Sequence, residues 1–152
     1  MHRLIKLAAR LSVATALFTS VTSSIAADTI KIGWLSSLTG ALSSAAIAEN
    51  QGVQLAVDEI NKSGGILGRQ IELLTRDTAG DPTKAVNFAQ QLAFSDKVHF
   101  VIGPVNSGEG LAAVPILARA GIPNLVIGAI DELIDPVKYP RAFRVKIGRA
   151  HV

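Results

Sequence analysis

From residue 29 onwards, short apolar segments alternate with longer segments in which apolar residues recur every three or four positions. The short segments predict β-strands, because strands in a buried sheet are brief and apolar. They cover residues 29–35, 70–76, 98–102, 124–127 and 141–145. The longer segments predict amphipathic helices over residues 44–62 and 82–94, and a third helix from Ser107. In the first helix Val53, Ala56, Val57 and Ile60 form one stripe.

Glycine, proline and helix-capping residues indicate where these elements begin and end. Ser63-Gly64-Gly65 is expected to end the first helix, because glycine adopts the left-handed turn after a helix at little cost. Asp81-Pro82 predicts the start of the second helix, with a capping carboxylate and proline in the first turn. Ser107 is expected to cap the third helix, and Pro115 is expected to kink it or mark a restart.

Strands that alternate with helices predict an α/β fold with a parallel sheet covered on both faces. The right-handed crossover rule favours a Rossmann-like sheet of flavodoxin-like order 2-1-3-4-5. Ligands of such sheets bind beyond the carboxyl ends of the strands, where the strand order reverses. Here that point lies between the loops 36–44 and 103–108, which are rich in small and hydroxyl-bearing residues. Each loop leads into a helix, so the sequence predicts a site that favours an anion.

The first 26 residues have the pattern of a secretory signal peptide. Arg3, Lys6 and Arg10 precede an apolar run, and Ser24 and Ala26 supply small residues before the cleavage point. The chain has 15 Lys+Arg and 12 Asp+Glu, so without those three basic residues both counts are 12. The expected mature chain is therefore close to neutral, and no nucleic-acid partner is predicted.

The last six residues, 147–152, match the translation of a common sequencing adapter. We therefore expect that the gene sequence ran into adapter and that the natural protein continues. Processing scars are excluded from reasoning about the fold. This leaves residues 27–146 as one incomplete domain.

Several kinds of chemistry have no support in the residues. The chain has no Cys, which excludes disulfides and thiolate nucleophiles. The glycines at 103–108 have phosphate-loop spacing, but Glu109-Gly110 stands where a Lys-Ser/Thr pair is required. His99 is expected in a buried strand, so no usable Ser-His-Asp set remains. We predict no enzyme activity, no metal and no cofactor.

The ordered motifs of the chain resemble the leucine/isoleucine/valine-type periplasmic binding proteins of ABC transporters. These motifs follow one another in the order and spacing of that family. They are IGWLSSLTG at 32–40, GVQLAVDEIN at 52–61, GGILGR at 64–69, the segment 77–82, VIGP at 101–104 and AGIP at 120–123. The resemblance implies two Rossmann-like lobes that close on a ligand, of which this chain holds the first.

The resemblance also implies a function. The expected role is that of a periplasmic, monomeric substrate-binding component that captures an amino acid or similar small carboxylate and delivers it to an inner-membrane ABC permease. A second hypothesis is a ligand-sensing module of the same fold that feeds a receptor or regulator. A third, a secreted Rossmann-like enzyme, lacks the acid/base and nucleophile sets.

Site residues follow from the resemblance position by position. Ser107 matches the serine that binds the ligand's α-carboxylate, with help from helix-start amides such as that of Gly108. Gly128 matches the position whose carbonyl accepts from the ligand's ammonium group, in the segment that continues through Ala129 and Ile130.

Two positions depart from the family pattern. Ile130 stands where a hydroxyl is common, and Ala45 stands where branched-chain binders carry an aromatic cover. Both departures put ordinary leucine binding in question. Glu109 either satisfies the helix dipole or pairs with a cationic part of an unusual ligand.

Overall fold

The computed structural model describes residues 28–145 of the 152-residue chain. The predicted signal peptide (1–26) and the predicted adapter segment (147–152) lie outside the described residues, so both stay predictions.

The described residues form a five-stranded parallel sheet of order β2-β1-β3-β4-β5. This confirms the order predicted from the sequence. The strands are β1 (Ile30–Ser36), β2 (Ile71–Asp77), β3 (Phe100–Ile102), β4 (Asn124–Val126) and β5 (Ala142–Arg144). Each lies within a residue or two of its predicted range, and β3 and β5 are the ones most shortened.

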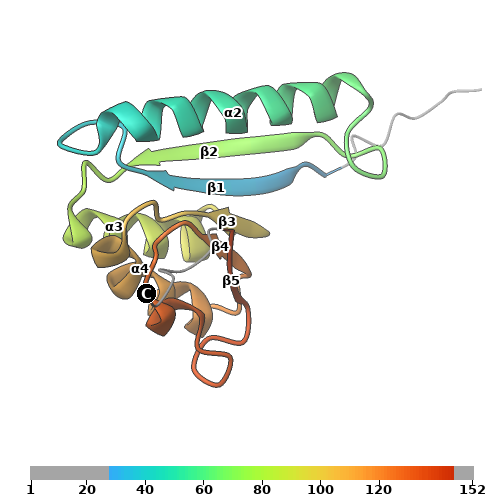
Figure 1. Ribbon diagram of the computed structural model, residues 1–152. Helices are drawn as coiled ribbons and strands as arrows, with labels where there is room; N and C mark the ends of the chain where they lie inside the picture. Colours follow the sequence, from blue (N-terminus) through green and yellow to red (C-terminus); the bar gives the residue numbers. More distant parts are fainter. Residues whose placement is uncertain (1–27, 146–152) are drawn as a thin grey trace, which may run out of the picture.

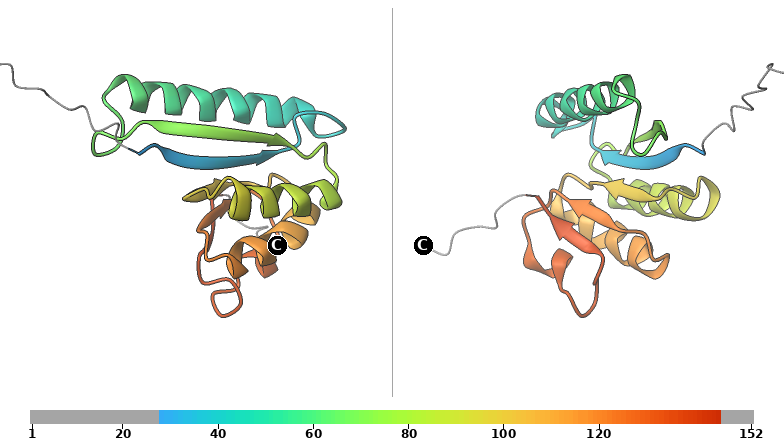
Figure 2. Two further views of the ribbon diagram at one scale, coloured as in Figure 1. Left: turned by 180° about the vertical axis from the view of Figure 1, so that it is seen from behind. Right: turned by 90° about the vertical axis from the view of Figure 1, so that its right-hand side faces the viewer.

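Helices cover both faces of this sheet (Figures 1 and 2). Helix α2 (Ser43–Lys62) lies along β1 and β2 on one face, whereas α3 (Pro82–Gln90) and α4 (Ser107–Arg119) pack against each other on the opposite face. A π-helical turn, η1 (Gln91–Ser95), prolongs α3, and a 3₁₀ turn, η2 (Asp131–Ile134), follows β4. No helix in the described range is long and apolar enough to cross a membrane.

The main core lies between the sheet and the pair α3 and α4. Leu35 of β1 and Val101 of β3 are fully buried there against Leu92 and Leu117. Burial of one such leucine side chain is worth roughly 1.5–3 kcal/mol. Gly33 permits the close contact, because a Cβ at this position would lie 2.8 Å from the Cδ1 atom of Leu92. The sheet can therefore hold η1 tightly beneath β1 and β3.

The face of the sheet against which α2 packs is covered over only part of its width. Ile102 and Leu125 remain half-buried, and they line an apolar cavity of about 360 Å³ with Val53 of α2. The sequence predicted a third strand buried on both faces, and within the described residues this prediction is wrong for β3. Helix α2 follows β1 and β2, so its side chains do not reach across β3 and β4.

The cap of the second helix is confirmed. The Asp81 side chain accepts a hydrogen bond of 2.7 Å from the amide of Thr83, with Pro82 as the first helical residue. The predicted cap of the next helix is wrong. Asn106 caps α4, because its side chain accepts from the amide of Glu109 at 2.9 Å and leaves Ser107 as the first helical residue.

Of the two alternatives predicted for Pro115, a kink or a restart, the restart is excluded, because helix α4 continues through this residue. The prediction that His99 lies in a buried strand is wrong. His99 is exposed and lies just before β3, where its Nδ1 atom accepts a hydrogen bond of 3.1 Å from the amide of Lys31. Only the last three residues of the apolar segment 98–102 therefore form a strand, which is β3.

Candidate functional site

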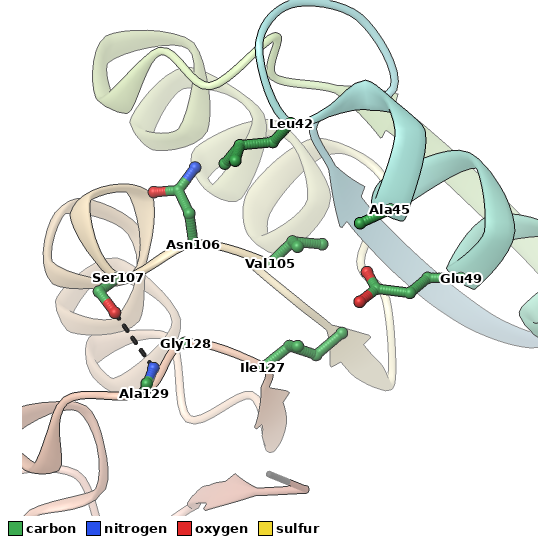
Figure 3. A pocket seen from close by; sticks show the side chains of 9 residues that line it. All are labelled: Leu42, Ala45, Glu49, Val105, Asn106, Ser107, Ile127, Gly128 and Ala129. Carbon is green, nitrogen blue, oxygen red and sulfur yellow. Dashed lines mark hydrogen bonds between the residues drawn. The ribbon is translucent and has the colours of Figure 1, made fainter. Parts of the chain in front are cut away.

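A pocket of about 280 Å³ opens beyond the carboxyl ends of β3 and β4, at the strand-order reversal predicted from the sequence. One wall comes from the first half of α2, and the other comes from the segments that follow β3 and β4 (Figure 3). The lining residues are Leu42, Ala45, Glu49, Val105, Asn106, Ser107, Ile127, Gly128 and Ala129. This location is the usual ligand position of open parallel sheets.

The Ser107 hydroxyl lies in the pocket wall and connects α4 to the segment after β4. Its oxygen accepts a hydrogen bond of 3.1 Å from the amide of Ala129, drawn as the dashed line in Figure 3. A hydroxyl has one donor hydrogen in addition to its acceptor lone pairs. Because the Ala129 amide occupies a lone pair, the Ser107 O–H can donate to an acceptor in the pocket.

The amino end of α4 adds a backbone donor beside this hydroxyl. The Glu109 amide donates to the Asn106 side chain, and the Gly110 amide donates to the Asn106 carbonyl at 3.0 Å. The amide of Ser107 precedes these bonds and is a helix-start donor within the pocket lining, whereas Gly108 lies outside the lining. Together with the helix dipole, the Ser107 amide makes this end of the pocket attractive to a carboxylate.

Gly128 lets the segment after β4 approach the start of α4. A Cβ atom at this position would lie 2.8 Å from the Cδ1 atom of Leu133 and 3.2 Å from the Cα atom of Ser107. Any larger residue must therefore move Ser107 or Leu133. The glycine is needed for packing as well as for any contact that its carbonyl makes.

Arg144 of β5 holds the same segment from the other side. Its Nη1 atom donates to the Ala129 carbonyl at 3.2 Å and to Oδ1 of Asp131 at 2.8 Å. The Arg144 side chain is only 12% exposed, although Asp131 is largely solvated. Ala129 is thus bound through its amide to Ser107 and through its carbonyl to Arg144, which fixes this wall of the pocket.

Glu109 is fully buried and does not line the pocket. Its Oε2 atom accepts a hydrogen bond of 3.0 Å from the Ser37 hydroxyl and a second one from the Asn106 side-chain amide. The Ser37 hydroxyl lies 3.4 Å from the hydroxyl of Thr78. The carboxylate therefore joins α4 to the loops after β1 and β2, and this position does not support pairing with a cationic ligand.

The loop between β1 and α2 is held by Asp77 at the end of β2. The Asp77 carboxylate accepts from the Thr39 hydroxyl at 2.7 Å and from the amides of Thr39 and Ala79 at 3.2 and 2.9 Å. Burial alone raises the pKa of Asp77, but these hydrogen bonds outweigh it and hold the pKa below its ordinary value. The loop that positions Leu42 at the pocket is thereby anchored to the sheet.

The structure brings four of the six predicted site residues into the pocket lining, namely Ala45, Ser107, Gly128 and Ala129. It does not bring in the other two. Gly108 is exposed on the first turn of α4, and Ile130 packs against the buried cluster of Val114, Val126 and Leu133. Ile130 therefore packs into the core in this structure, and a hydroxyl at this position would not line the pocket.

Three further lining residues, Leu42, Val105 and Asn106, lie in the loops 36–44 and 103–108 that the sequence predicted for the site, although they were not singled out. Sequence reasoning missed Glu49 and Ile127. A signal for Glu49 was present. It lies four residues before Val53 and four after Ala45, so it falls on the inward stripe of α2. A charged residue on an otherwise apolar stripe is a reason to look for a binding role.

The described residues contain no group of three or more His, Cys, Asp or Glu side chains that could hold a metal ion. What the pocket offers is a hydroxyl, a helix-start amide, one carboxylate and an apolar remainder. Such a set can bind a small polar ligand by hydrogen bonds and exclude water from its apolar part.

Comparison with known proteins gives a consistent result. The model of the periplasmic binding protein family matches residues 29–148. The leucine-, isoleucine-, valine-, threonine- and alanine-binding protein of Pseudomonas aeruginosa is 34% identical over 135 residues, which cover 89% of this chain and 36% of that protein. The Leu/Ile/Val-binding protein BraC3 of Rhizobium johnstonii is 41% identical over 93 residues, which cover 61% of this chain and 25% of that protein.

A solved structure agrees with both relatives. The branched-chain amino acid transporter substrate-binding protein LivJ of Streptococcus pneumoniae, in complex with isoleucine, superposes with a TM-score of 0.75 at 36% identity. The superposition covers 80% of this chain and 34% of LivJ, so this chain spans about a third of that protein's length. By the family match over residues 29–148 and the shared fold, this chain belongs to the periplasmic binding protein family, and the relatives it matches are named as binding proteins for leucine, isoleucine and valine.

Proposed function

We propose that this chain is the first lobe of the substrate-binding component of an ABC importer, which captures an amino acid or similar small carboxylate in the periplasm. The observation that carries the proposal is the pocket at the strand-order reversal, with the Ser107 hydroxyl at its wall and the start of α4 beside it. These groups donate hydrogen bonds, and a carboxylate only accepts them. The relatives named for amino acids and the solved complex with isoleucine support the same ligand class.

Within the described residues the pocket is partly open to solvent. The two-lobed organisation expected for the complete protein would close this opening, and ligand capture is therefore a property of the full-length protein. In this proposal the first lobe supplies the carboxylate subsite and part of the apolar wall, and delivery to an inner-membrane permease follows from the complete protein. The protein itself catalyses no reaction.

The test is isothermal titration calorimetry of the full-length protein, freed of ligand, with each of the twenty L-amino acids. We expect saturable binding of at least one of them with a one-to-one stoichiometry. A full-length protein that binds none of the twenty would contradict the proposal. The neighbouring genes provide a separate check, because permease and ATPase genes support import, whereas a kinase domain in the same reading frame would support a sensor.

A further inference from the structure

Glu109 lies behind the pocket on the first turn of α4, and its side chain is fully buried. Two donors converge on its Oε2 atom, namely the Ser37 hydroxyl at 3.0 Å and the Asn106 side-chain amide. Its Oε1 atom is also buried and has no hydrogen-bond partner among residues 28–145. One oxygen therefore makes all the hydrogen bonds of this carboxylate within the described part of the chain.

The two donors belong to the segments that form the two walls of the pocket. Asn106 lines the pocket at the start of α4, whereas Ser37 follows β1 in the loop that leads to Leu42, the lining residue just before α2 (Figure 3). The Asn106 side chain is held at both ends, because its Oδ1 atom accepts from the Glu109 amide at 2.9 Å while its amide group donates to the Glu109 carboxylate. The Oε2 atom thus joins the α2 wall to the start of α4.

We propose that Glu109 is a positioning residue for ligand binding, which holds the α2 wall and the start of α4 at the correct separation without contacting the ligand. This inference rests on the proposed function, because its effect is measured through the binding of a small carboxylate at Ser107. Hydrogen bonds to a charged acceptor are stronger than those between neutral groups, and a buried donor that loses its acceptor is costly. Without the Oε2 acceptor, Asn106 and the loop after β1 should shift, and the pocket would no longer be preorganised for its ligand.

An electrostatic role for Glu109 makes the opposite prediction. A negative charge on the first turn of α4 offsets the positive end of the helix, where the ligand carboxylate is proposed to bind. Removal of that charge would by itself tighten the binding of a carboxylate, because like charges repel. A positioning role predicts weaker binding instead, and only for replacements that remove the acceptor.

Two replacements of similar size separate these roles. Glu109→Gln removes the charge but can place its one oxygen where Oε2 accepts both bonds, with its nitrogen at the position of Oε1, to which none of the described residues donates. Glu109→Leu removes the charge and the acceptor together.

Asn61→Leu is the matched control, because it also removes two hydrogen bonds between neighbouring segments. The Asn61 side chain donates to the Ile71 carbonyl at 2.9 Å and accepts from the Ile71 amide at 2.7 Å, which joins the end of α2 to the first residue of β2. These bonds lie at the amino end of β2, whereas the pocket lies beyond the carboxyl ends of the strands. The control therefore lowers stability without reaching the pocket.

Calorimetry of the full-length protein measures the Kd for the L-amino acid that the wild type binds most tightly among the twenty, after circular dichroism has shown that each variant is folded. We expect Glu109→Leu to weaken binding by at least tenfold and Glu109→Gln to stay within threefold of the wild type. Asn61→Leu should keep the wild-type affinity. Ser37→Ala removes only the donor on the α2 side, should weaken binding by threefold or more, and takes the place of Glu109→Leu if that variant fails to fold.

Three results would overturn the inference while the proposed function stands. The first is binding by folded Glu109→Leu, or by Ser37→Ala in its place, within twofold of the wild type. The second is equal weakening by Glu109→Gln and Glu109→Leu, which would assign the effect to the charge. The third is equal weakening by Asn61→Leu, which would show that affinity follows stability alone. A wild type that binds no amino acid would instead remove the proposed function and the inference with it.

Discussion

The Ser107 hydroxyl oxygen accepts a hydrogen bond of 3.1 Å from the backbone amide of Ala129, although 22 residues separate the two along the chain. This bond joins the first residue of α4 to the segment after β4, and it orients the hydroxyl at the pocket wall. Because Arg144 also binds the Ala129 carbonyl, the partner of Ser107 is itself held in place. The geometry of the proposed carboxylate subsite thus depends on β5, which contributes no residue to the pocket lining.

Replacement of Ser107 by alanine should weaken amino-acid binding by the full-length protein. The change removes the O–H donor to the ligand carboxylate and leaves the Ala129 amide without its acceptor. A partner left unsatisfied costs about 1–3 kcal/mol, which corresponds to a five- to 150-fold rise in Kd. Calorimetry checks this, with Ser44→Ala on exposed α2 surface as the control. Unchanged affinity would show that Ser107 does not contact the ligand.

Replacement of Glu109 by alanine should destabilise the fold. The Ser37 hydroxyl and the Asn106 side chain would lose their shared acceptor in a fully buried position. We expect a loss of about 1–3 kcal/mol in the free energy of unfolding, measured by urea denaturation. Glu109→Gln keeps one side-chain oxygen as an acceptor and should lose less. Equal losses for the two variants would contradict this, because glutamine keeps the volume of glutamate and one side-chain oxygen, and neither would then contribute to stability.

Asp77 should make the stability of the protein depend on pH. Its folded-state pKa is lowered, so the carboxylate contributes stability at pH values above its ordinary pKa of about 4. That contribution should disappear as the pH falls through the lower folded-state pKa. Asp77→Asn should therefore be less stable than the wild type at pH 7, and the gap should narrow towards pH 3. Urea denaturation at both pH values checks this.

The exposed Asp58 provides the control for that experiment, because Asp58→Asn changes the same charge on the surface of α2. Its effect on stability should be small at both pH values, as is usual for surface charges. If the difference in unfolding free energy between the wild type and Asp77→Asn were the same at pH 7 and pH 3, this would contradict the assigned role of the carboxylate.

Two glycine-to-alanine changes should act in opposite directions. Gly103 follows β3 with a φ of +95°, and an added Cβ would collide with the Leu35 carbonyl oxygen. We expect Gly103→Ala to destabilise by more than about 1 kcal/mol, the strain cost of left-handed backbone alone. Gly52 lies inside α2 with open space around its Cα atom, so Gly52→Ala should stabilise by about 0.5–1 kcal/mol. Thermal denaturation of both variants shows whether the melting temperature falls for Gly103→Ala and rises for Gly52→Ala.

Much of the fold was predictable from local pattern. The alternation of apolar runs and helical stripes predicted all five strands and the three main helices, and the crossover rule predicted their order. The position of the pocket followed, because strand order decides where the carboxyl ends diverge. Ala45, Ser107, Gly128 and Ala129 could be predicted for the same reason, with the family resemblance to select them.

What the tertiary structure decided lies at the level of single residues. Asn106 rather than Ser107 caps α4, because the cap depends on the backbone angles of one residue at the start of the helix. Ile130 joins the core while Ala129 faces the pocket, because neighbouring residues in an extended segment point to opposite sides. Glu49 faces the pocket and Glu109 is buried because of what packs around each, and no local pattern of a single chain contains that information.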